Sequence, residues 1–489
     1  MLGAPGFDVT APHGGGRRAA TPSCGAADDG AADDEWFSAW RARELSRLEH
    51  AGITYLDYTG AALYPESLVR GDAARLQGVV LGNPHSQHGP SRAATRDADD
   101  ARRALLAFLH ADPAEYAVIF TANASAACRL VGEGFPFAPG GAFLASADNH
   151  NSVNGIREYA RARGATIRVV PLDDDLHLTG LDTLLDDAPR GGALFALPAQ
   201  SNFSGVRHSL ASIAAARERG WHVFLDAASF VPTTELRLDQ VRPDFVALSL
   251  YKIAGYPTGV GALVARHEAL ATLRRPAFAG GAVDWVSVQG SRHRLARWPE
   301  GFEDGTIPFL ALGAVAPALE AVHAAGRTRL PAHLGRLTSA FLAGIAALQH
   351  GDGSPVVAVH GPRDGSTRGA TVALSVRRAE SAGGMPLPYW EVEEAARAAG
   401  LALRGGCFCN PGCAERAFAL DAERTGACFD ELGDRFTIPR LAACLGGASV
   451  GALRVEGEGS LGAPGVAEAA AAQGEAGGAR GFLHLPVRE

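Results

Sequence analysis

The chain has 489 residues, of which 47% are hydrophobic and 20% charged, and its formal net charge is −8. This composition is typical of a globular protein with a large core, and the acidic balance argues against a nucleic-acid partner. No apolar run is long enough to cross a bilayer and no signal-peptide pattern opens the sequence, so we expect a cytoplasmic protein without a membrane partner. The seven cysteines are an odd number and too few for a disulfide scaffold, so we expect free thiols.

The predicted elements begin after a polar segment. Residues 1–34 are rich in Gly, Ala, Pro and Asp without periodicity, which predicts a disordered N-terminal extension. A helix is expected from Glu35 to about His50. Buried apolar runs then alternate with helical patterns, which predicts an α/β fold with a large, mostly parallel sheet. Strands are expected at 118–121, 193–197, 222–226 and 245–250, and helices at 122–134, 210–219 and 310–325.

The pattern of elements restarts after about residue 330, which predicts a second domain. Strands are expected there near 356–359, 370–376 and 401–404. We therefore expect four parts: the extension at 1–34, a large domain at 35–325 whose first part also packs with the small domain, a smaller C-terminal α/β domain at 326–456, and a flexible tail at 457–489.

Lys252 is the only lysine in the chain, and all other Lys/Arg positions are arginine. A guanidinium stays protonated and cannot condense with a carbonyl, whereas a buried lysine amine can lose its proton. Lys252 follows the apolar run 245–251 and precedes a Gly/Pro-rich turn at 253–259. We therefore interpret Lys252 as a Schiff-base residue, against the alternative of a chance surface position.

A Schiff base with pyridoxal phosphate would need three further groups: an acid at the pyridine nitrogen, a donor at the phenolic oxygen and a helix N-terminus at the phosphate. Asp226 ends the buried run 222–226 and is the candidate acid, although a helix N-cap would show the same pattern. The segment 121–125 joins a strand to a helix and is the candidate phosphate cradle. Asn202 follows a strand and is the candidate donor, and His150 is a candidate for stacking on the ring.

An arginine opens a glycine-rich loop that holds Cys407, Cys409 and Cys413. The glycines predict an exposed loop, and the arginine favours thiolate over thiol, which suits a nucleophilic cysteine that accepts sulfur. A zinc or iron–sulfur site that adds Cys428 or Cys444 is a competing interpretation. The C-x-C-x₃-C spacing differs from the usual C-x₂-C pattern, so we assign no metal.

Together these residues resemble class V aminotransferase-fold enzymes, and more narrowly the cysteine-desulfurase-like domain of molybdenum cofactor sulfurases. The resemblance implies the type I fold of pyridoxal-phosphate-dependent transferases. The segments that carry it are 55–62, 82–87, 118–121, 198–205, 225–230, 251–253, 302–306 and 406–410.

The resemblance also implies a role for each site residue. Lys252 forms the Schiff base, Asp226 pairs with the pyridine nitrogen, and His150 stacks on the ring. Cys409 lies five residues after Arg404, which is the offset of the persulfide cysteine in related desulfurases, and Cys407 is the alternative carrier. The other assignments are Asn202 and Ser229 near the phenolic oxygen, Ala124, Ser125 and Ser249 at the phosphate, Thr306 at the phosphate from the partner subunit of a homodimer, and Arg404 and Arg454 at the substrate carboxylate.

The implied reaction is desulfuration of L-cysteine, with sulfur captured as a persulfide on Cys409 and alanine released. The same apparatus without sulfur capture would serve a C–S lyase, β-eliminase, decarboxylase or aminotransferase. A non-catalytic sulfur carrier or metal-binding scaffold is the alternative of a different class.

The chain also departs from the family pattern. Gly405 stands where the family has threonine, which loosens the cysteine loop, and Glu456 stands where a short apolar strand is expected, which questions how the C-terminal end docks. Eukaryotic molybdenum cofactor sulfurases continue into a molybdopterin-binding domain, for which we expect no room in this chain. The sulfur acceptor is therefore open between a separate protein, a free cofactor and a small molecule.

Overall fold

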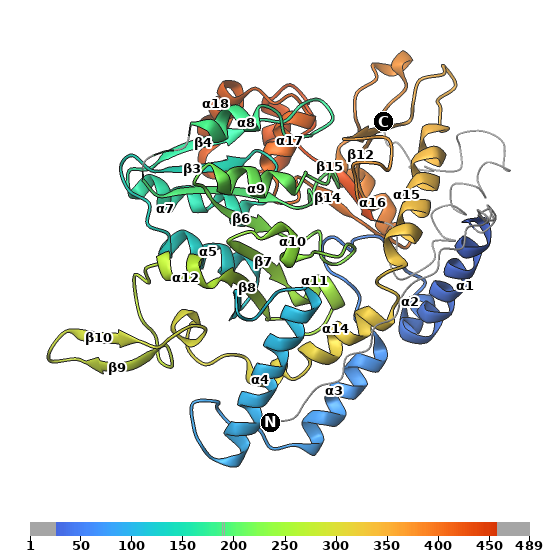
Figure 1. Cartoon of the computed structure of the whole chain (residues 1–489). Coiled ribbons are helices and arrows are strands. Elements are labelled where there is room, and N and C mark those ends of the chain that lie inside the picture. The colour runs from blue at the N-terminus through green and yellow to red at the C-terminus, as the bar shows by residue number, and fades with distance from the viewer. Residues whose placement is uncertain (1–25, 188, 190, 457–489) are drawn as a thin grey trace, which may run out of the picture.

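The computed structural model describes residues 26–187, 189 and 191–456 (Figure 1). Residues 1–25 of the predicted extension and the predicted tail at 457–489 lie outside the described part. No helix within that part is long and apolar enough to cross a membrane.

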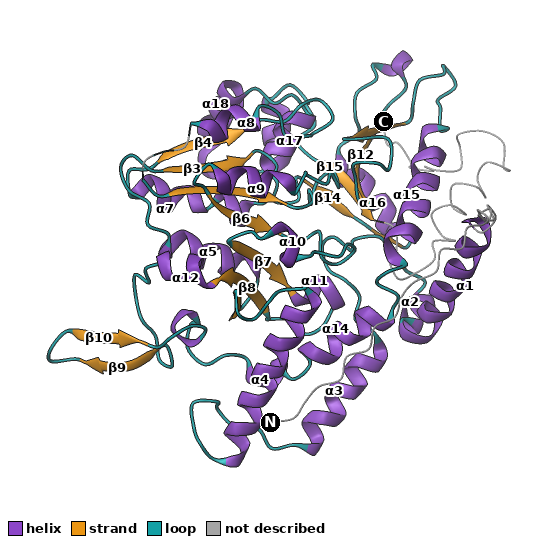
Figure 2. Ribbon diagram, in the orientation of Figure 1, coloured by secondary structure: helices purple, strands orange, loops and turns teal. Residues whose placement is uncertain are grey.

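A seven-stranded sheet forms the centre of the molecule, with helices on both sides (Figure 2). Its order is β2-β8-β7-β6-β5-β3-β4, and β8 is the one strand of the sheet that runs antiparallel to its neighbours. The strands are β2 (Tyr116–Thr121), β3 (Ala142–Ser146), β4 (Thr166–Val170), β5 (Ala193–Pro198), β6 (His222–Asp226), β7 (Phe245–Ser249) and β8 (Gly261–Arg266).

Alternate side chains of the central strands enter two separate cores, because a strand turns successive residues to opposite faces. In β6, Val223 and Leu225 pack on one face and Phe224 packs on the other. The helices of the first face include α4 (Gly89–Phe108), α8 (Leu181–Asp186), α9 (Ala211–Glu218), α10 (Leu238–Val241) and α14 (Val315–Ala324); those of the second include α5 (Ala124–Gly134), α6 (Asn151–Asn154), α7 (Ile156–Ala162) and α12 (His267–Thr272).

A second, four-stranded antiparallel sheet lies in the C-terminal part, in the order β11-β12-β15-β14. A short parallel pair joins β1 (Thr54–Tyr55) to β13 (Leu401–Ala402), so the segment after the N-terminal helices lies beside this part. The other elements here are β11 (Val357–His360), β12 (Thr371–Val376), β14 (Arg404–Gly406), β15 (Ala452–Glu456), α15 (Leu330–Ala346), α16 (Tyr389–Ala398), α17 (Pro411–Ala417), α18 (Ala422–Leu432) and α19 (Ile438–Cys444). The predicted boundary near residue 325 stays a prediction.

The remaining elements connect these parts. The strands β9 (Val283–Ser287) and β10 (Arg292–Leu295) form a hairpin that projects from the body (Figure 1). The helices α3 (Glu66–Gly78), α11 (Leu250–Ala254) and α13 (Phe309–Leu312) connect the other elements.

The N-terminal prediction is wrong between residues 26 and 34, because α1 covers Ala26–Glu44 and α2 covers Ser46–Ala51. The alanine-rich segment has a high helix propensity. Its carboxylates also find partners on α15, since Asp34 accepts from Arg336 at 2.7 Å and lies 2.8 Å from His333. Tertiary contacts therefore order a segment whose composition predicts disorder.

The single helix predicted at 310–325 is two helices, α13 and α14. Arg75 donates to the carbonyl oxygen of Leu310 at 2.6 Å, so that oxygen does not receive the amide of Ala314 as it would in a continuous helix. The predicted strand at 401–404 is likewise split, because β13 and β14 belong to different sheets.

Two expectations about the C-terminal part are wrong. Glu456 does not disturb the docking of the C-terminal end, because it is the last residue of β15, is 4% exposed, and accepts from the hydroxyl of Thr59 at 2.6 Å. The cysteines are not all free, because Cys428 and Cys444 form a disulfide. This pairing also removes both from the competing metal site, and no cluster of three or more candidate ligands lies within the described residues.

Candidate active site

Lys252 and Asp226 lie at neighbouring strand ends of the central sheet. Asp226 ends β6, and Lys252 lies in α11, which directly follows β7. Because β6 and β7 are parallel and adjacent, their carboxyl ends open on the same edge, where α/β sheets bind ligands. One oxygen of Asp226 accepts from the amide of Ala228 at 3.0 Å. No described residue donates to its other oxygen, which leaves that oxygen for a ligand.

The surroundings of Lys252 lower the pKa of its amine. Burial lowers the pKa of Lys252 below its usual value, the negative charge of Asp226 opposes this shift, and the charges of Arg454 and Arg404 add to it. A cavity of about 80 Å³ borders Lys252 and Ser229, but neither Asp226 nor His150 lines it, so it does not mark the space between these groups. The chain therefore provides an amine that loses its proton more readily than an exposed lysine does.

His150 lies close to both groups. Burial lowers its pKa, and the charge of Asp226 opposes the shift while that of Lys252 adds to it. Its Nδ1 accepts from the amide of Ser152 at 3.1 Å, so the proton of a neutral ring lies on Nε2. A neutral ring near the pair suits the stacking role expected from the sequence.

The N-terminus of α5 forms the candidate phosphate cradle. The amide of Ala124 donates to the Ser249 hydroxyl at 2.9 Å, and the Ser125 hydroxyl lies 2.6 Å from that of Ser152. A Cβ atom at Gly261 would overlap the backbone of Asn123, so glycine permits this close turn against β8. The hydroxyls of Ser125, Ser152 and Ser249 thus lie at the start of an 11-residue helix, where the amide of Ser125 has no hydrogen-bond acceptor among the described residues.

Thr306 forms no hydrogen bond with the cradle residues of its own chain in the described part. It is exposed, and its hydroxyl accepts a long hydrogen bond of 3.5 Å from Asn83. Its predicted role across a subunit boundary stays a prediction.

Asn202 contacts the cysteine loop. Its Nδ2 donates to the carbonyl of Phe408 at 2.7 Å, and its Oδ1 accepts from Asn410 at 3.0 Å. An amide nitrogen carries two N–H groups, so one remains for the phenolic oxygen to which the sequence assigned it.

Arg404 and Arg454 lie together, as predicted for a carboxylate site, and both bind Asp57. The Asp57 carboxylate is 3.2 Å from Nε of Arg404 and 2.6 Å from Nη2 of Arg454. Arg454 is 2% exposed, and its buried Nε has no hydrogen-bond partner among the described residues. The two guanidinium groups of Arg404 and Arg454 share the single carboxylate of Asp57, so they can also bind the carboxylate of a substrate.

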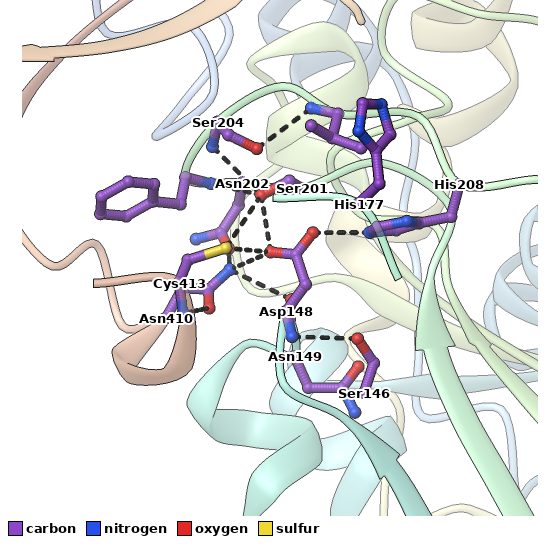
Figure 3. Close-up of polar contacts among 12 residues, drawn as sticks. Ser146, Asp148, Asn149, His177, Ser201, Asn202, Ser204, His208, Asn410 and Cys413 are labelled. Atoms are coloured by element: carbon purple, nitrogen blue, oxygen red, sulfur yellow. Dashed lines mark hydrogen bonds and ion pairs between the residues drawn. The ribbon is translucent and has the colours of Figure 1, made fainter. Parts of the chain in front are cut away.

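Sequence reasoning did not single out Asp57, although the segment 55–62 that contains it carries part of the resemblance. It also missed Asp148 and Asn410. Figure 3 shows both inside a buried network that also holds Ser201, His208 and Cys413. Asp148 comes two residues before His150, and Asn410 directly follows Cys409. Their position beside predicted site residues was the available sequence signal.

The three loop cysteines have different surroundings. Cys409 is exposed, Cys407 is partly buried near Tyr389, and Cys413 is buried. Burial, together with the nearby charge of Asp148, raises the pKa of the Cys413 thiol well above its usual value, so Cys413 stays a thiol. Among the free cysteines of the described part, Cys409 is the exposed one.

Comparisons with known proteins show the family and the fold of the chain. The model of the family described as Aminotransferase class-V matches residues 54–418. Molybdenum cofactor sulfurase of Arabidopsis thaliana is 34% identical over 427 residues, which cover 78% of this chain and 51% of that protein. The apo cysteine desulfurase of Thermococcus onnurineus NA1 aligns with a TM-score of 0.72 at 22% identity, over 90% of this chain and 97% of that one. A C-DES mutant with glycine covalently linked to its PLP cofactor aligns with a TM-score of 0.61 at 19% identity, over 74% of this chain and 91% of that one.

The structural likenesses confirm the predicted fold, an α/β type I fold with a large, mostly parallel sheet. The chain spans about half the length of the curated relatives it matches. The family match covers most of the described chain and includes Lys252, Asp226 and Cys409. The chain belongs to the class V aminotransferase family of enzymes.

Proposed function

We propose that this chain is a pyridoxal-phosphate-dependent cysteine desulfurase that takes sulfur from L-cysteine as a persulfide on Cys409 and releases alanine. One contact carries the proposal. The amide of Asn151, the residue after His150, donates to the carbonyl oxygen of Cys409 at 2.6 Å. This hydrogen bond connects the exposed Cys409 to the segment that contains His150, the candidate for stacking on the cofactor ring.

The residues present fit pyridoxal phosphate. Lys252 supplies an amine of lowered pKa, Asp226 a carboxylate oxygen without a donor, and the start of α5 a cradle of amides and hydroxyls. When bound, the cofactor would supply an electron sink for bonds at the substrate's α-carbon. Lys252, Asp226, His150, Asn202, Ser229, Ala124, Ser125 and Ser249 would hold it.

The remaining groups act on the substrate. Arg404 and Arg454 would bind its carboxylate, with Asp57 keeping both guanidinium groups in place. The Lys252 amine, once free, is the base for the α-proton. The Cys409 thiolate attacks the substrate sulfur, so that a sulfur–sulfur bond forms and the substrate carbon–sulfur bond breaks. The bonding electrons of the broken bond stay on the substrate carbon, which takes up a proton and leaves as part of alanine.

The partners and the location belong to the same proposal. We propose a homodimer, a sulfur acceptor that receives the persulfide sulfur, and a cytoplasmic location. The proposed acceptor is a protein or a small molecule.

The test is an assay of the purified holoenzyme with L-cysteine, in which alanine, sulfide and protein-bound persulfide are measured together. We expect alanine in amounts equal to the sulfur released, and a persulfide mapped to Cys409 by mass spectrometry. Pyruvate and ammonia in place of alanine would instead identify a β-eliminating lyase, and a colourless protein that binds no cofactor would identify a non-catalytic scaffold.

A further inference from the structure

We propose that Asp148 is a positioning residue that fixes the backbone of the Cys409 loop against the large sheet. The inference rests on the proposed function, because it concerns the cysteine assigned there as the sulfur carrier. Asp148 follows β3 and is fully buried. It touches neither Lys252 nor Asp226 and so acts through the loop.

Four side chains converge on the Asp148 carboxylate (Figure 3). Oδ1 accepts from the Ser201 hydroxyl at 2.7 Å, the Asn410 amide at 2.7 Å and the Cys413 thiol at 2.8 Å, and Oδ2 lies 2.6 Å from Nε2 of His208. A buried carboxylate is stable only when its oxygens receive such donors. Both oxygens of the Asp148 carboxylate therefore have hydrogen-bonding partners.

Asn410 carries this anchoring into the cysteine loop. It is fully buried, its Nδ2 also donates to the Asp148 carbonyl at 3.1 Å, and its Oδ1 caps α17 by accepting from the amide of Cys413 at 3.3 Å. A Cβ atom on Gly412 would overlap the carbonyl oxygen of Ala147, so α17 begins in direct contact with the end of β3. The residue after Cys409 is thus held on both sides.

The loop that is held in this way has a strained backbone. Phe408 and Cys409 have φ angles of 55° and 58°, in the left-handed region that is unfavourable for a non-glycine residue. Asn202 binds the carbonyl of Phe408 at 2.7 Å and Asn151 binds that of Cys409 at 2.6 Å. Such a conformation persists where its surroundings fix it, and these contacts, with the Asp148 network behind them, supply that restraint.

The consequence concerns the sulfur step. Attack on the substrate sulfur requires the thiolate at a defined place, and displacement by about 1 Å can cost on the order of 100-fold in rate. Loss of the Asp148 contacts would release the strained loop, while Lys252, Asp226 and the start of α5 have no hydrogen bond to Asp148 and keep their own contacts. Asn202 contacts the network through Asn410 and also holds Phe408. Asp148 therefore affects capture of sulfur more than binding of L-cysteine.

The test variant is Asp148→Asn in the holoenzyme, with Asp244→Asn as the matched control. Asp244 is also a buried aspartate near a histidine, 3.9 Å from His222, but it lies at the opposite end of the strands. In Asp148→Asn we expect persulfide formation on Cys409 to slow by 10-fold or more, with the dissociation constant for L-cysteine, read from the cofactor spectrum, changed by less than about threefold. In Asp244→Asn we expect any loss to appear in stability, with the persulfide rate per folded enzyme unchanged.

A second pair of variants covers the case in which Asp148→Asn does not fold. Cys413→Ala removes one donor to Asp148, and Cys413→Ser replaces it with another. We expect Cys413→Ala to slow persulfide formation and Cys413→Ser to restore it. A persulfide rate equal to that of the wild type in a folded Asp148→Asn variant, or in Cys413→Ala where Asp148→Asn does not fold, would overturn the proposal.

One further measurement separates this proposal from the proposed function. Amide hydrogen exchange at residues 407–410 reads the loop without any substrate, and we expect it to speed up at least 10-fold in Asp148→Asn but not in the control. A wild type that forms no persulfide would refute the desulfurase function and leave this measurement to judge the anchoring. Unchanged exchange in the variant would refute the anchoring whatever the reaction is.

Discussion

The chemistry of Lys252 follows from its surroundings and from the absence of any other lysine in the sequence. We predict that Lys252→Arg lacks the visible absorbance of the covalently bound cofactor, because an arginine cannot form a Schiff base and no second lysine can replace it. The measurement is the absorbance spectrum after addition of pyridoxal phosphate and gel filtration. Adding a lysine at an exposed helix position, as Arg70→Lys in the same background, should not restore it. A borohydride-reducible chromophore in Lys252→Arg would refute the assignment.

The second residue-level prediction concerns Cys409 and Cys407. Cys409→Ala should bind the cofactor and L-cysteine normally, since Cys409 makes no contact with Lys252 or the cradle, but should lose persulfide and alanine release. Cys407→Ala should retain most of the activity, because the exposed thiol remains. Mass spectrometry of the cysteine-treated enzyme locates the sulfur. A persulfide on Cys407 would reverse the assignment, and alanine formation in the double variant would favour a lyase or transaminase.

Local sequence rules find residues whose chemistry is visible in their own segment. Lys252 and Asp226 stand at the ends of buried apolar runs, and the structure places both at one sheet edge. Asp57 and Asp148 are different, because their partners lie far along the chain: Asp57 binds Arg454 across 397 positions, and Asp148 binds Asn410 across 262. No local pattern encodes such pairs, and only the fold brings them together.

At the level of elements, α18 and α19 are joined by the disulfide between Cys428 and Cys444, which closes a loop of 16 residues. The loop-closure model gives such a crosslink about 3 kcal/mol. We therefore predict that the Cys428→Ser, Cys444→Ser double variant lowers the melting temperature and exposes the α18–α19 segment to proteases.

The same prediction has an internal control. Dithiothreitol should destabilise the wild type but not the double variant. Titration of the denatured, unreduced wild type should count two fewer thiols than the seven cysteines of the sequence. A count of seven would show that the thiols are free, as the sequence alone suggested.

Strands could be predicted from the sequence where several consecutive residues are apolar and buried. The strands β5, β6 and β7 lie within a residue of their predicted limits, because each contains a run of at least three consecutive apolar residues that is buried on both faces. The predictions failed where a distant side chain intervenes. Arg75 interrupts the helix expected at 310–325, and Arg336 of α15 binds Asp34 of the N-terminal segment. Both arginines lie far along the chain from the segments that they affect, so the local sequence could not reveal them.

At the level of the whole molecule, the position of Thr306 bears on assembly. Within one chain it is exposed, and its hydroxyl accepts from Asn83. The resemblance implies that Thr306 holds the cofactor phosphate of a second copy of the chain. A homodimer would then have two composite sites, each with Lys252 from one subunit and Thr306 from the other.

Composite sites predict complementation between two defective chains. Thr306→Ala should form dimers that lose the cofactor more readily, and Lys252→Arg should form dimers without the covalent chromophore. In a mixed dimer, one site combines the intact Lys252 of the first chain with the intact Thr306 of the second, while the other site carries both substitutions. Co-expression with two affinity tags yields this dimer, and its absorbance should show wild-type cofactor retention at half of the sites. Retention no better than that of Thr306→Ala alone would place Thr306 in its own subunit's site or outside the site, and a monomer with full cofactor occupancy would exclude composite sites altogether.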